Sequence, residues 1–454
     1  MRFEAVKSNG LAHTSYYLSD SGEATVIDPR RDAQIYLTLA KQDSAEIKYV
    51  FETHRNEDYI VGSREIGART EARILHSDAI PFKYGEKISD GEKLKVGRFE
   101  FEALFTPGHT PEHTSYAAYD TKSGDQPLMA FTGDTLFIGD VGRTDLPGLD
   151  RWEEMSENLY YSLHEKILSL GDQVLLYPAH TAGSICGSRI SSRKMSTIGY
   201  EKQTNPQLSL DKEEFIKNRL DNEMLRPPYF RRMEEWNLNG PPLLPKEPEG
   251  LDAEAFEEKM ETSSTVVLDT REPDAFAGSH IPNSLNIWIG GVSYFPGWVI
   301  SYDEEILLLS DELSKTEKVI RYLHRIGYDD IAGYLSSNIM NWRDRGNPME
   351  TLGTVSASTA KRLLEKEDVL LLDVREETEY DEGHVKDSMN IYVGLIQDEI
   401  DKIPKNTKII TTCGWGGRGG TAASILMRKE FEDVHNLLGG MKAWKSLGYP
   451  LITS

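Results

Sequence analysis

The 454-residue sequence contains only two cysteines, Cys186 and Cys413. They are too few and too far apart to form a disulfide framework, so both thiols are expected to be reduced and free. No run of about 18 consecutive apolar residues occurs, and the first residues lack the apolar segment of a signal peptide. No membrane partner is therefore expected, and a cytoplasmic location is predicted.

Basic residues are also few, because 51 Lys and Arg stand against 74 Asp and Glu, a net charge of −23. This balance argues against nucleic acid and anionic membranes as partners. At about 100 to 200 residues per domain, the length predicts about three domains. Prolines and glycines crowd between Asn237 and Gly250, a stretch that favours neither helix nor central strand, so the first domain is expected to end there.

An internal repeat follows this stretch. The segment Leu268–Glu272 (LDTRE) returns as Leu372–Glu376 (LDVRE), about a hundred residues later. In both copies, apolar β-type runs alternate with helical patterns, which is typical of an α/β domain with a parallel sheet. The repeated Asp-x-Arg, Gly-His and Trp elements are expected to be structural. The predicted domains are residues 1–240, 250–350 and 353–454.

Four loops in the first half of the chain carry His and Asp residues, which are common metal ligands in proteins. They are Thr53–Tyr59 (THRNEDY), Thr106–Thr110 (TPGHT), Thr132–Asp134 (TGD) and Tyr177–His180 (YPAH). Each follows a short apolar run that predicts a strand. Ligands are expected where strands end, on loops that a rigid sheet holds in place.

These loops, in this order, resemble the metallo-β-lactamase superfamily, in which the first loop reads T-H-x-H-x-D-H and helps to hold two zinc ions. Here Asn56 and Tyr59 replace the second and third histidines. Removing these two leaves His54, His109 and Asp134 around one metal. Two imidazoles and one carboxylate form the facial triad of non-haem Fe(II) chemistry, so redox chemistry is favoured over hydrolysis.

Within that superfamily the chain resembles the persulfide dioxygenases of the ethylmalonic-encephalopathy-protein type. The resemblance implies an αββα sandwich with one Fe(II) per subunit on His54, His109 and Asp134. It implies oxidation of a small thiol persulfide (of glutathione, coenzyme A or bacillithiol) by O2 to sulfite. The Gly142–Asp145 loop and Tyr177 would lie near the substrate, with Arg143 as a binding residue. A homo-oligomer, a dimer or a tetramer, is expected.

Asp58 and His180 are left without the partners that would complete a second metal site. They keep a rival open, a zinc thioesterase resembling glyoxalase II. A non-enzymatic persulfide carrier or sensor would follow if the metal site were empty. Cys186 and Arg189, just past the His180 loop, could hold sulfur and a substrate anion respectively, but a structural thiol explains Cys186 equally well.

The second repeat carries a cysteine loop that the first lacks. Cys413 follows the apolar strand Ile409–Ile410 and precedes a glycine-rich turn, Arg418 and a helical pattern over Thr421–Lys429. The predicted contacts to a bound anion come from Gly414, Trp415, Gly416 and Gly417. Backbone N–H groups, the helix dipole and Arg418 all favour a thiolate nucleophile and a bound anion.

This loop and its repeat resemble the rhodanese sulfurtransferases, in which the loop cysteine carries a persulfide. The six-residue spacing from Cys413 to Arg418 favours sulfur over phosphate, for which related phosphatases use a loop one residue longer. The resemblance implies sulfur exchange between Cys413, sulfite and thiosulfate. In the first copy Ser310 stands at the cysteine position, without the glycines or the arginine, so the middle domain is expected to be an inactive rhodanese.

Overall fold

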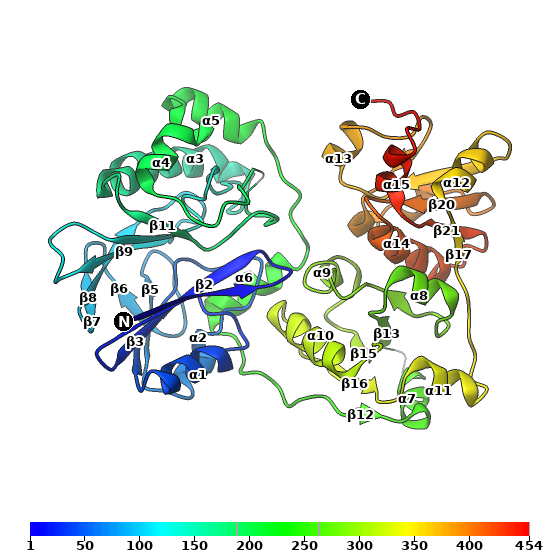
Figure 1. The fold of residues 1–454 in the computed structure, drawn as a ribbon, viewed down its shortest axis with the longest axis horizontal. Helices are drawn as coiled ribbons and strands as arrows, with labels where there is room; N and C mark the ends of the chain where they lie inside the picture. The colour runs from blue at the N-terminus through cyan, green and yellow to red at the C-terminus, as the bar shows by residue number, and fades with distance from the viewer. Residues whose placement is uncertain (188, 262–263, 454) are drawn as a thin grey trace. The chain divides into compact units, whose positions relative to one another are not determined.

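A computed structural model describes residues 1–187, 189–261 and 264–453 (Figure 1). The chain divides into two units, Met1–Pro245 with His324–Gly327 and Lys246–Leu323 with Tyr328–Ser454. None of the described helices has both the length and the apolar character needed to cross a bilayer. The predicted domain limits and the cytoplasmic location stay predictions, and the last limit, Ser454, lies outside the described residues.

The N-terminal unit begins with a six-stranded sheet. Its strands, in spatial order, are β1 (Arg2–Ser8), β2 (His13–Asp20), β3 (Glu23–Ile27), β4 (Glu46–Phe51), β5 (Arg73–Ser77) and β6 (Glu86–Ile88). The first three strands are antiparallel, and β3 to β6 are parallel. Helices α1 (Gln34–Gln42) and α2 (Ser63–Gly67) bury Tyr36 and Ile66 against Val26 of this sheet.

A second sheet packs on the first. Its five strands, in spatial order, are β11 (Leu175–Pro178), β10 (Met129–Gly133), β9 (Thr114–Asp120), β8 (Phe99–Phe105) and β7 (Lys93–Val96). Between the two sheets, Leu18 and Phe51 of the first share a buried core with Phe101 and Phe131 of the second. Alternation of apolar and polar residues along β8 gives the sheet this inner face.

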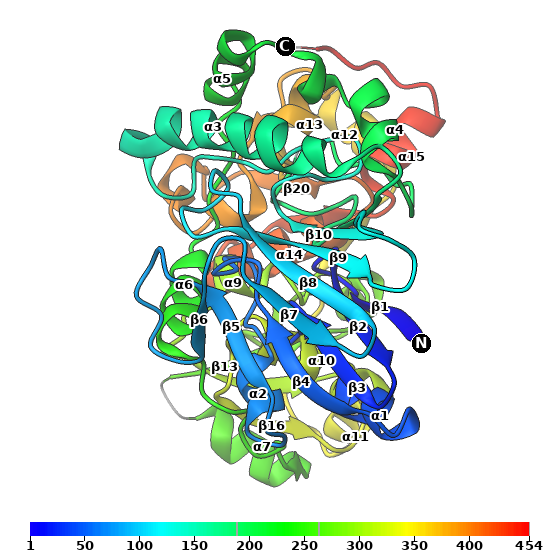
Figure 2. The ribbon, with the colours of Figure 1, turned by 90° about the vertical axis from the view of Figure 1, so that its left-hand side faces the viewer.

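Helices cover the other face of the second sheet. They are α3 (Trp152–Tyr161), continued by a π-helical stretch (Ser162–Ile167), α4 (Ile198–Thr204) and α5 (Lys212–Leu220). Leu159 and Phe215 pack there with Ala130 of β10. Figure 2 shows the layers in order, from α3 through β9 and β4 to α1. The predicted αββα sandwich is confirmed.

The proline-rich break begins later than predicted. Helix α6 (Phe230–Asn239) includes Asn237. The Oδ1 atom of its side chain accepts a hydrogen bond from the N–H of Val61 at 3.1 Å. Residues 240–249 have no regular structure, and β12 starts at Gly250. The prolines therefore mark the linker, but the first residues of the predicted linker, from Asn237 to Asn239, belong to helix α6 of the N-terminal unit.

The C-terminal unit contains two parallel five-stranded sheets with the same strand order. The first has β12 (Gly250–Leu251), β16 (Ile331–Leu335), β15 (Glu305–Leu309), β13 (Thr265–Asp269) and β14 (Leu285–Asn286). The second has β17 (Gly353–Val355), β21 (Val434–Leu437), β20 (Lys408–Thr412), β18 (Val369–Asp373) and β19 (Met389–Asn390). All their strand pairs are parallel, as predicted.

Helices alternate with these strands. The first repeat has α7 (Ala253–Met260), α8 (Pro273–Gly278), α9 (Pro296–Val299), α10 (Leu313–Arg325) and α11 (Ile339–Asp344). The second has α12 (Ala357–Leu364), α13 (Glu377–Asp381), α14 (Gly417–Arg428) and α15 (Gly440–Ser446). Helix α14 starts four residues before the predicted Thr421, because the glycine-rich turn already enters the helix.

The repeated Asp-x-Arg element is structural, as predicted. Arg271 donates from Nε and Nη2 to Asp269 at 2.9 and 2.6 Å, and Arg375 bonds Asp373 with the same two distances. Both arginines are buried and also donate to a backbone carbonyl eight residues ahead. A bidentate pair with a further bond to the backbone braces each domain at the ends of β13 and β18.

Candidate functional site

The three candidate metal ligands lie where strands of the N-terminal unit end. His54 follows β4, His109 follows β8, and Asp134 comes directly after β10. All three side chains are at most 2% exposed. Because the two sheets pack face to face, loops from both meet at one edge, and the rigid strands hold the side chains there.

The donor atoms of these residues converge. His109 Nε2 lies 3.4 Å from Oδ2 of Asp134, and His54 Nε2 lies 4.0 Å from the same oxygen. Ligands bound to one ion at about 2.0–2.2 Å lie about 3–4 Å from one another. Neither Nε2 atom has a hydrogen-bond partner among the described residues. Buried donors of this kind fit a divalent cation.

Hydrogen bonds to Nδ1 orient both imidazoles. His109 Nδ1 lies 2.9 Å from the carbonyl oxygen of Arg143, so it carries the proton and donates it. His54 Nδ1 lies 2.8 Å from Oγ1 of Thr53, whose hydroxyl donates to Asp28. Thr53 therefore accepts from His54. Both rings keep the Nε2 lone pair for a metal, the arrangement that metal-binding histidines usually adopt.

Gly142 lets the next loop approach the ligands. A Cβ at this position would lie 2.0 Å from the carbonyl oxygen of Asp134 and 3.2 Å from His109 Nδ1. The close approach brings the Arg143 carbonyl to His109. The guanidinium of Arg143 is buried and binds Asp145 through Nε and Nη2 at 2.6 and 2.5 Å. Since its donors are engaged, the predicted substrate contact of Arg143 stays a prediction.

His180 bridges the two carboxylates near the site. Its Nδ1 lies 2.7 Å from Oδ1 of Asp134, and its Nε2 lies 2.9 Å from Oδ2 of Asp58. Burial acts to lower the pKa of His180, but Asp134 and Asp58 raise it well above its usual range. Burial acts to raise the pKa of Asp134, but His180, His109 and His54 lower it. His180 thus holds Asp134 in place through a hydrogen bond between two groups that favour each other's charged form.

Cys186 faces the same site. Its Sγ belongs to two clusters whose donor atoms lie within 4.8 Å of one another, one with His109 and Asp134 and one with Asp58 and His180. The side chain is 1% exposed, and burial raises the pKa of the thiol. This position fits a thiol beside a bound metal and equally a buried structural thiol.

Glu57 was missed by the sequence analysis. Its Oε2 lies 3.8 Å from Nε2 of His109 and 3.9 Å from Nε2 of His54. The carboxylate is 1% exposed. The only signal in the sequence is its place inside the altered first loop, where no ligand is expected between Asn56 and Asp58.

Two other residues predicted to lie near the substrate, Tyr177 and Arg189, are not grouped with the candidate ligands. The ring of Tyr177 packs in the aromatic core, with centroids 4.8 Å from Phe3 and 5.5 Å from Phe131. Arg189 is exposed, and its backbone N–H donates to Asp140 at 2.7 Å. Tyr177 therefore supports the sheet beneath the site, while a substrate contact by Arg189 stays a prediction.

A second candidate site surrounds Cys413, directly after β20. The side chain is 1% exposed, and the N–H of Gly416 donates to its Sγ at 3.1 Å. Gly416 has φ 123°, a conformation that favours glycine, and it starts helix α14 at Gly417. The turn thus places a backbone donor on the sulfur directly before the start of α14.

The guanidinium of Arg418 is paired with Glu379 of α13. Nη1 and Nη2 donate to the two carboxylate oxygens at 2.5 and 2.8 Å. Burial acts to lower the pKa of Arg418, but Glu379 raises it; burial acts to raise the pKa of Glu379, but Arg418 lowers it. Nη2 lies 3.7 Å from where a Cβ of Gly414 would be, so Arg418 is beside the loop yet held by a carboxylate.

A tryptophan of the middle domain packs on the Cys413 loop. Trp288 contacts Trp415 edge-on, with ring centroids 5.4 Å apart. A Cβ on Gly417 would lie 3.0 Å from the Trp288 ring. Trp415 itself is 43% exposed. At the matching position of the middle domain Ser310 follows β15 and hydrogen-bonds Thr270 at 2.6 Å, so that loop carries no thiol.

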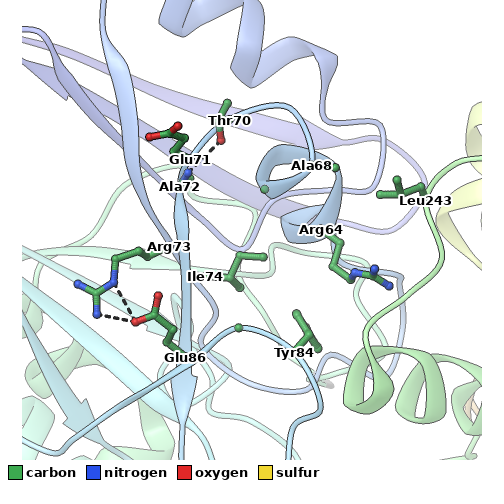
Figure 3. A pocket seen from close by; sticks show the side chains of 12 residues that line it. Arg64, Ala68, Thr70, Glu71, Ala72, Arg73, Ile74, Tyr84, Glu86 and Leu243 are labelled. Atoms are coloured by element: carbon green, nitrogen blue, oxygen red, sulfur yellow. Dashed lines mark hydrogen bonds and ion pairs between the residues drawn. The ribbon is translucent and has the colours of Figure 1, made fainter.

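A hollow of about 520 Å³ lies elsewhere on the N-terminal unit (Figure 3). Arg64, Arg73, Tyr84, Glu86 and Leu243 are among its lining residues, and Arg73 donates to Glu86. None of the residues that line it is a candidate ligand. We therefore base the function on the two loop clusters and not on this hollow.

Comparison with known proteins agrees with the two-part organisation. The model of the metallo-beta-lactamase superfamily matches residues 8–182, and that of the rhodanese-like domain matches residues 252–344 and 356–447. Persulfide dioxygenase ETHE1 of Bos taurus is 35% identical over 213 residues, which are 45% of this chain and 74% of the relative. The chain belongs to the metallo-beta-lactamase superfamily, as a homologue of its persulfide dioxygenases. The predicted fusion of a metallo-beta-lactamase domain with two rhodanese-like domains is confirmed.

Two further relatives of the metallo-beta-lactamase domain bear on its chemistry. A metallo-beta-lactamase structure from Staphylococcus aureus subsp. aureus COL is 30% identical, with a TM-score of 0.67, and covers 74% of this chain and 98% of its own. Hydroxyacylglutathione hydrolase GloC of Haemophilus influenzae is 29% identical over 213 residues, 42% of this chain and 89% of the relative. The superfamily therefore includes both oxidative and hydrolytic relatives of this domain.

Proposed function

We propose that the protein is an iron-dependent persulfide dioxygenase joined to a sulfurtransferase. The observation that carries this proposal is the convergence of His54, His109 and Asp134, with two unpartnered Nε2 atoms, in a homologue of persulfide dioxygenases. A thiol persulfide, O2 and water would give the thiol and sulfite: RSSH + O2 + H2O → RSH + H2SO3. The outer sulfur is oxidised and O2 is reduced.

In this proposal Fe(II), held by the three residues, supplies the redox chemistry with O2 that amino-acid side chains lack. Thr53 and the carbonyl of Arg143 keep both imidazoles oriented through Nδ1. His180 keeps the Asp134 carboxylate in place. Burial of these groups excludes bulk water, which protects a reactive sulfur substrate from side reactions.

The rhodanese part would move sulfane sulfur through Cys413. A Cys413 persulfide would pass its outer sulfur to sulfite: Cys–S–S⁻ + SO3²⁻ → Cys–S⁻ + S2O3²⁻. The new S–S bond of thiosulfate forms as the enzyme S–S bond breaks, and the electron pair stays on Cys413. The Gly416 N–H and the start of α14 would stabilise that thiolate. The same step can run in reverse.

The substrates proposed are small persulfides, those of glutathione, coenzyme A or bacillithiol, together with O2, sulfite and thiosulfate. A dimer or tetramer and a cytoplasmic location complete the proposal. Joining both activities in one chain keeps a reactive product near its next acceptor.

A second candidate is a zinc-dependent hydrolase of the glyoxalase II type. Two observations favour it: the buried cluster of Asp58, His180 and Cys186, and the likeness to hydroxyacylglutathione hydrolases. The loss of two motif histidines, at Asn56 and Tyr59, speaks against a dinuclear site.

Anaerobic purification followed by metal analysis and an oxygen-electrode trace tests the proposal. About one iron per chain, with O2 uptake and sulfite release on adding glutathione persulfide, is expected. Two zinc ions per chain with O2-independent hydrolysis of S-lactoylglutathione would establish the rival. A protein that holds persulfide without any turnover would instead be a carrier or sensor.

A further inference from the structure

The Glu57 carboxylate lies inside the candidate metal site without a hydrogen bond. Both of its oxygens are buried and have no hydrogen-bond partner among the described residues. Oε2 lies 3.8 Å from His109 Nε2 and 3.9 Å from His54 Nε2, and these two nitrogens also lack partners. Three unsatisfied buried atoms therefore face one small space.

Such an arrangement is unfavourable unless something fills that space. Burying a polar group without a hydrogen bond costs about 1–3 kcal/mol, and an unpaired charge costs more. Donor atoms 3.8–3.9 Å apart are too distant to bond each other directly, but they match the spacing of two ligands around one cation. His54, Glu57 and His109 form a cluster that could hold a metal ion by this criterion.

We propose that Glu57 is a fourth protein ligand of the metal, beside His54, His109 and Asp134. This inference rests on the proposed metal centre and changes its composition. Two carboxylates balance the charge of a divalent ion, where one carboxylate leaves a net positive charge. One of the positions that a facial triad leaves open is then taken by protein, which leaves fewer for substrate and O2.

The first loop explains how this ligand arises. Asn56 and Tyr59 replace the two motif histidines, and the Asn56 side chain turns away to donate to the carbonyl of His54 at 3.2 Å. Glu57 points toward the ligands in their place. The loop has therefore exchanged imidazoles for a carboxylate, and oxygen donors favour harder cations than nitrogen donors do.

An ion pair with Arg55 is the competing explanation for Glu57. Arg55 Nη2 lies 3.5 Å from Oε1 of Glu57 and 3.3 Å from Oε1 of Glu234. This contact uses Oε1, whereas Oε2 is the oxygen that lies near the two imidazoles. If the pair were the whole role of Glu57, removing Arg55 would have the same effect on metal binding as removing the carboxylate.

The test compares Glu57→Gln with Arg55→Met in the full-length protein. Dissociation constants for Fe(II) and Co(II) are measured anaerobically by chelator competition, and the Co(II) absorption spectrum reports the ligand set. Loss of a residue that merely supports a ligand weakens metal binding about 10- to 100-fold. E57Q is therefore expected to weaken it at least about tenfold and to change the Co(II) spectrum, while R55M stays within about twofold of the unmodified protein.

Glu57→Asp, which keeps a shorter carboxylate, serves as the second variant and is expected to bind more tightly than E57Q. Circular dichroism checks that each variant folds; if E57Q does not, E57D must then show an altered Co(II) spectrum. If E57Q had the metal affinity and the Co(II) spectrum of the unmodified protein, Glu57 would not be a ligand, but the proposed function would stand. Equal losses of metal affinity in E57Q and R55M would lead to the same conclusion. An unmodified protein that binds neither Fe(II) nor Co(II) would overturn the proposed function with it.

Discussion

Glu379 binds the guanidinium of Arg418 through both of its oxygens, at 2.5 and 2.8 Å. Arg418 is the cation predicted to stabilise a sulfur oxyanion at the Cys413 loop. A carboxylate within the same chain therefore occupies the donors that Arg418 would offer to a bound anion. The pair is partly exposed, with 18% of the Arg418 and 39% of the Glu379 side chain accessible.

Replacing Glu379 is expected to release Arg418 for the substrate. Partly exposed ion pairs contribute about 0.2–1 kcal/mol, so the KM for thiosulfate in E379Q should fall about 1.4- to fivefold. Steady-state sulfurtransferase kinetics measure this change. Glu377→Gln removes the same charge from exposed α13 without an Arg418 contact and serves as the control. A higher KM in E379Q would mean that Glu379 positions Arg418 instead of competing for it.

Replacing Cys413 should separate the two activities. In Cys413→Ser the sulfur acceptor is lost while the ligand loops of the N-terminal unit keep their sequence. Thiosulfate formation is expected to stop and persulfide-dependent O2 uptake to continue at an unchanged rate. The oxygen electrode and separate assays for sulfite and thiosulfate measure both. Loss of O2 uptake in this variant would contradict a division into two sites.

Trp288 should matter for sulfur transfer although the middle domain has no thiol. Its ring packs on Trp415 and on Gly417, and an aromatic contact contributes about 0.5–1.5 kcal/mol. Trp288→Ala is therefore expected to lower the sulfurtransferase kcat/KM about three- to tenfold. Trp298→Ala removes another aromatic contact between the two rhodanese-like domains, the one with Tyr392. Equal losses in both variants would assign the effect to domain packing.

His180 should support the metal through Asp134. His180→Ala takes away a hydrogen-bond partner 2.7 Å from that carboxylate. Residues in this role typically change metal affinity about 10- to 100-fold, so Fe(II) should bind that much more weakly. His164→Ala, which removes an imidazole stacked on Tyr160 in the same unit, is the control. Unchanged metal content in H180A would show that Asp134 needs no such support.

Local sequence patterns predicted the frame of both sites. Apolar or alternating runs before His54 and His109 predicted strands β4 and β8, and the apolar run before Cys413 predicted β20, because strands that face a core need apolar residues on that face. Ligands at strand ends then follow from the loops. The strands and the ligand positions at their ends depend on residues that are close in sequence, so a short sequence motif is enough to predict them.

Contacts between distant segments could not be predicted in the same way. Glu379 meets Arg418 from 39 residues away, and Trp288 reaches Trp415 from another domain. Tyr177 packs in the core because its side of β11 faces the other sheet, which the loop motif does not reveal. Such pairings depend on how sheets and helices pack, and a single sequence does not specify them.

The matching Asp269–Arg271 and Asp373–Arg375 pairs show that the Asp–Arg brace of a rhodanese-like domain does not depend on a cysteine loop. The middle domain has kept the brace and lost the thiol loop. A duplicated domain can therefore lack the cysteine loop and still keep its fold, and its surface can then contact a neighbouring domain. Here the copy without a thiol places the indole ring of Trp288 against the cysteine loop of the other copy.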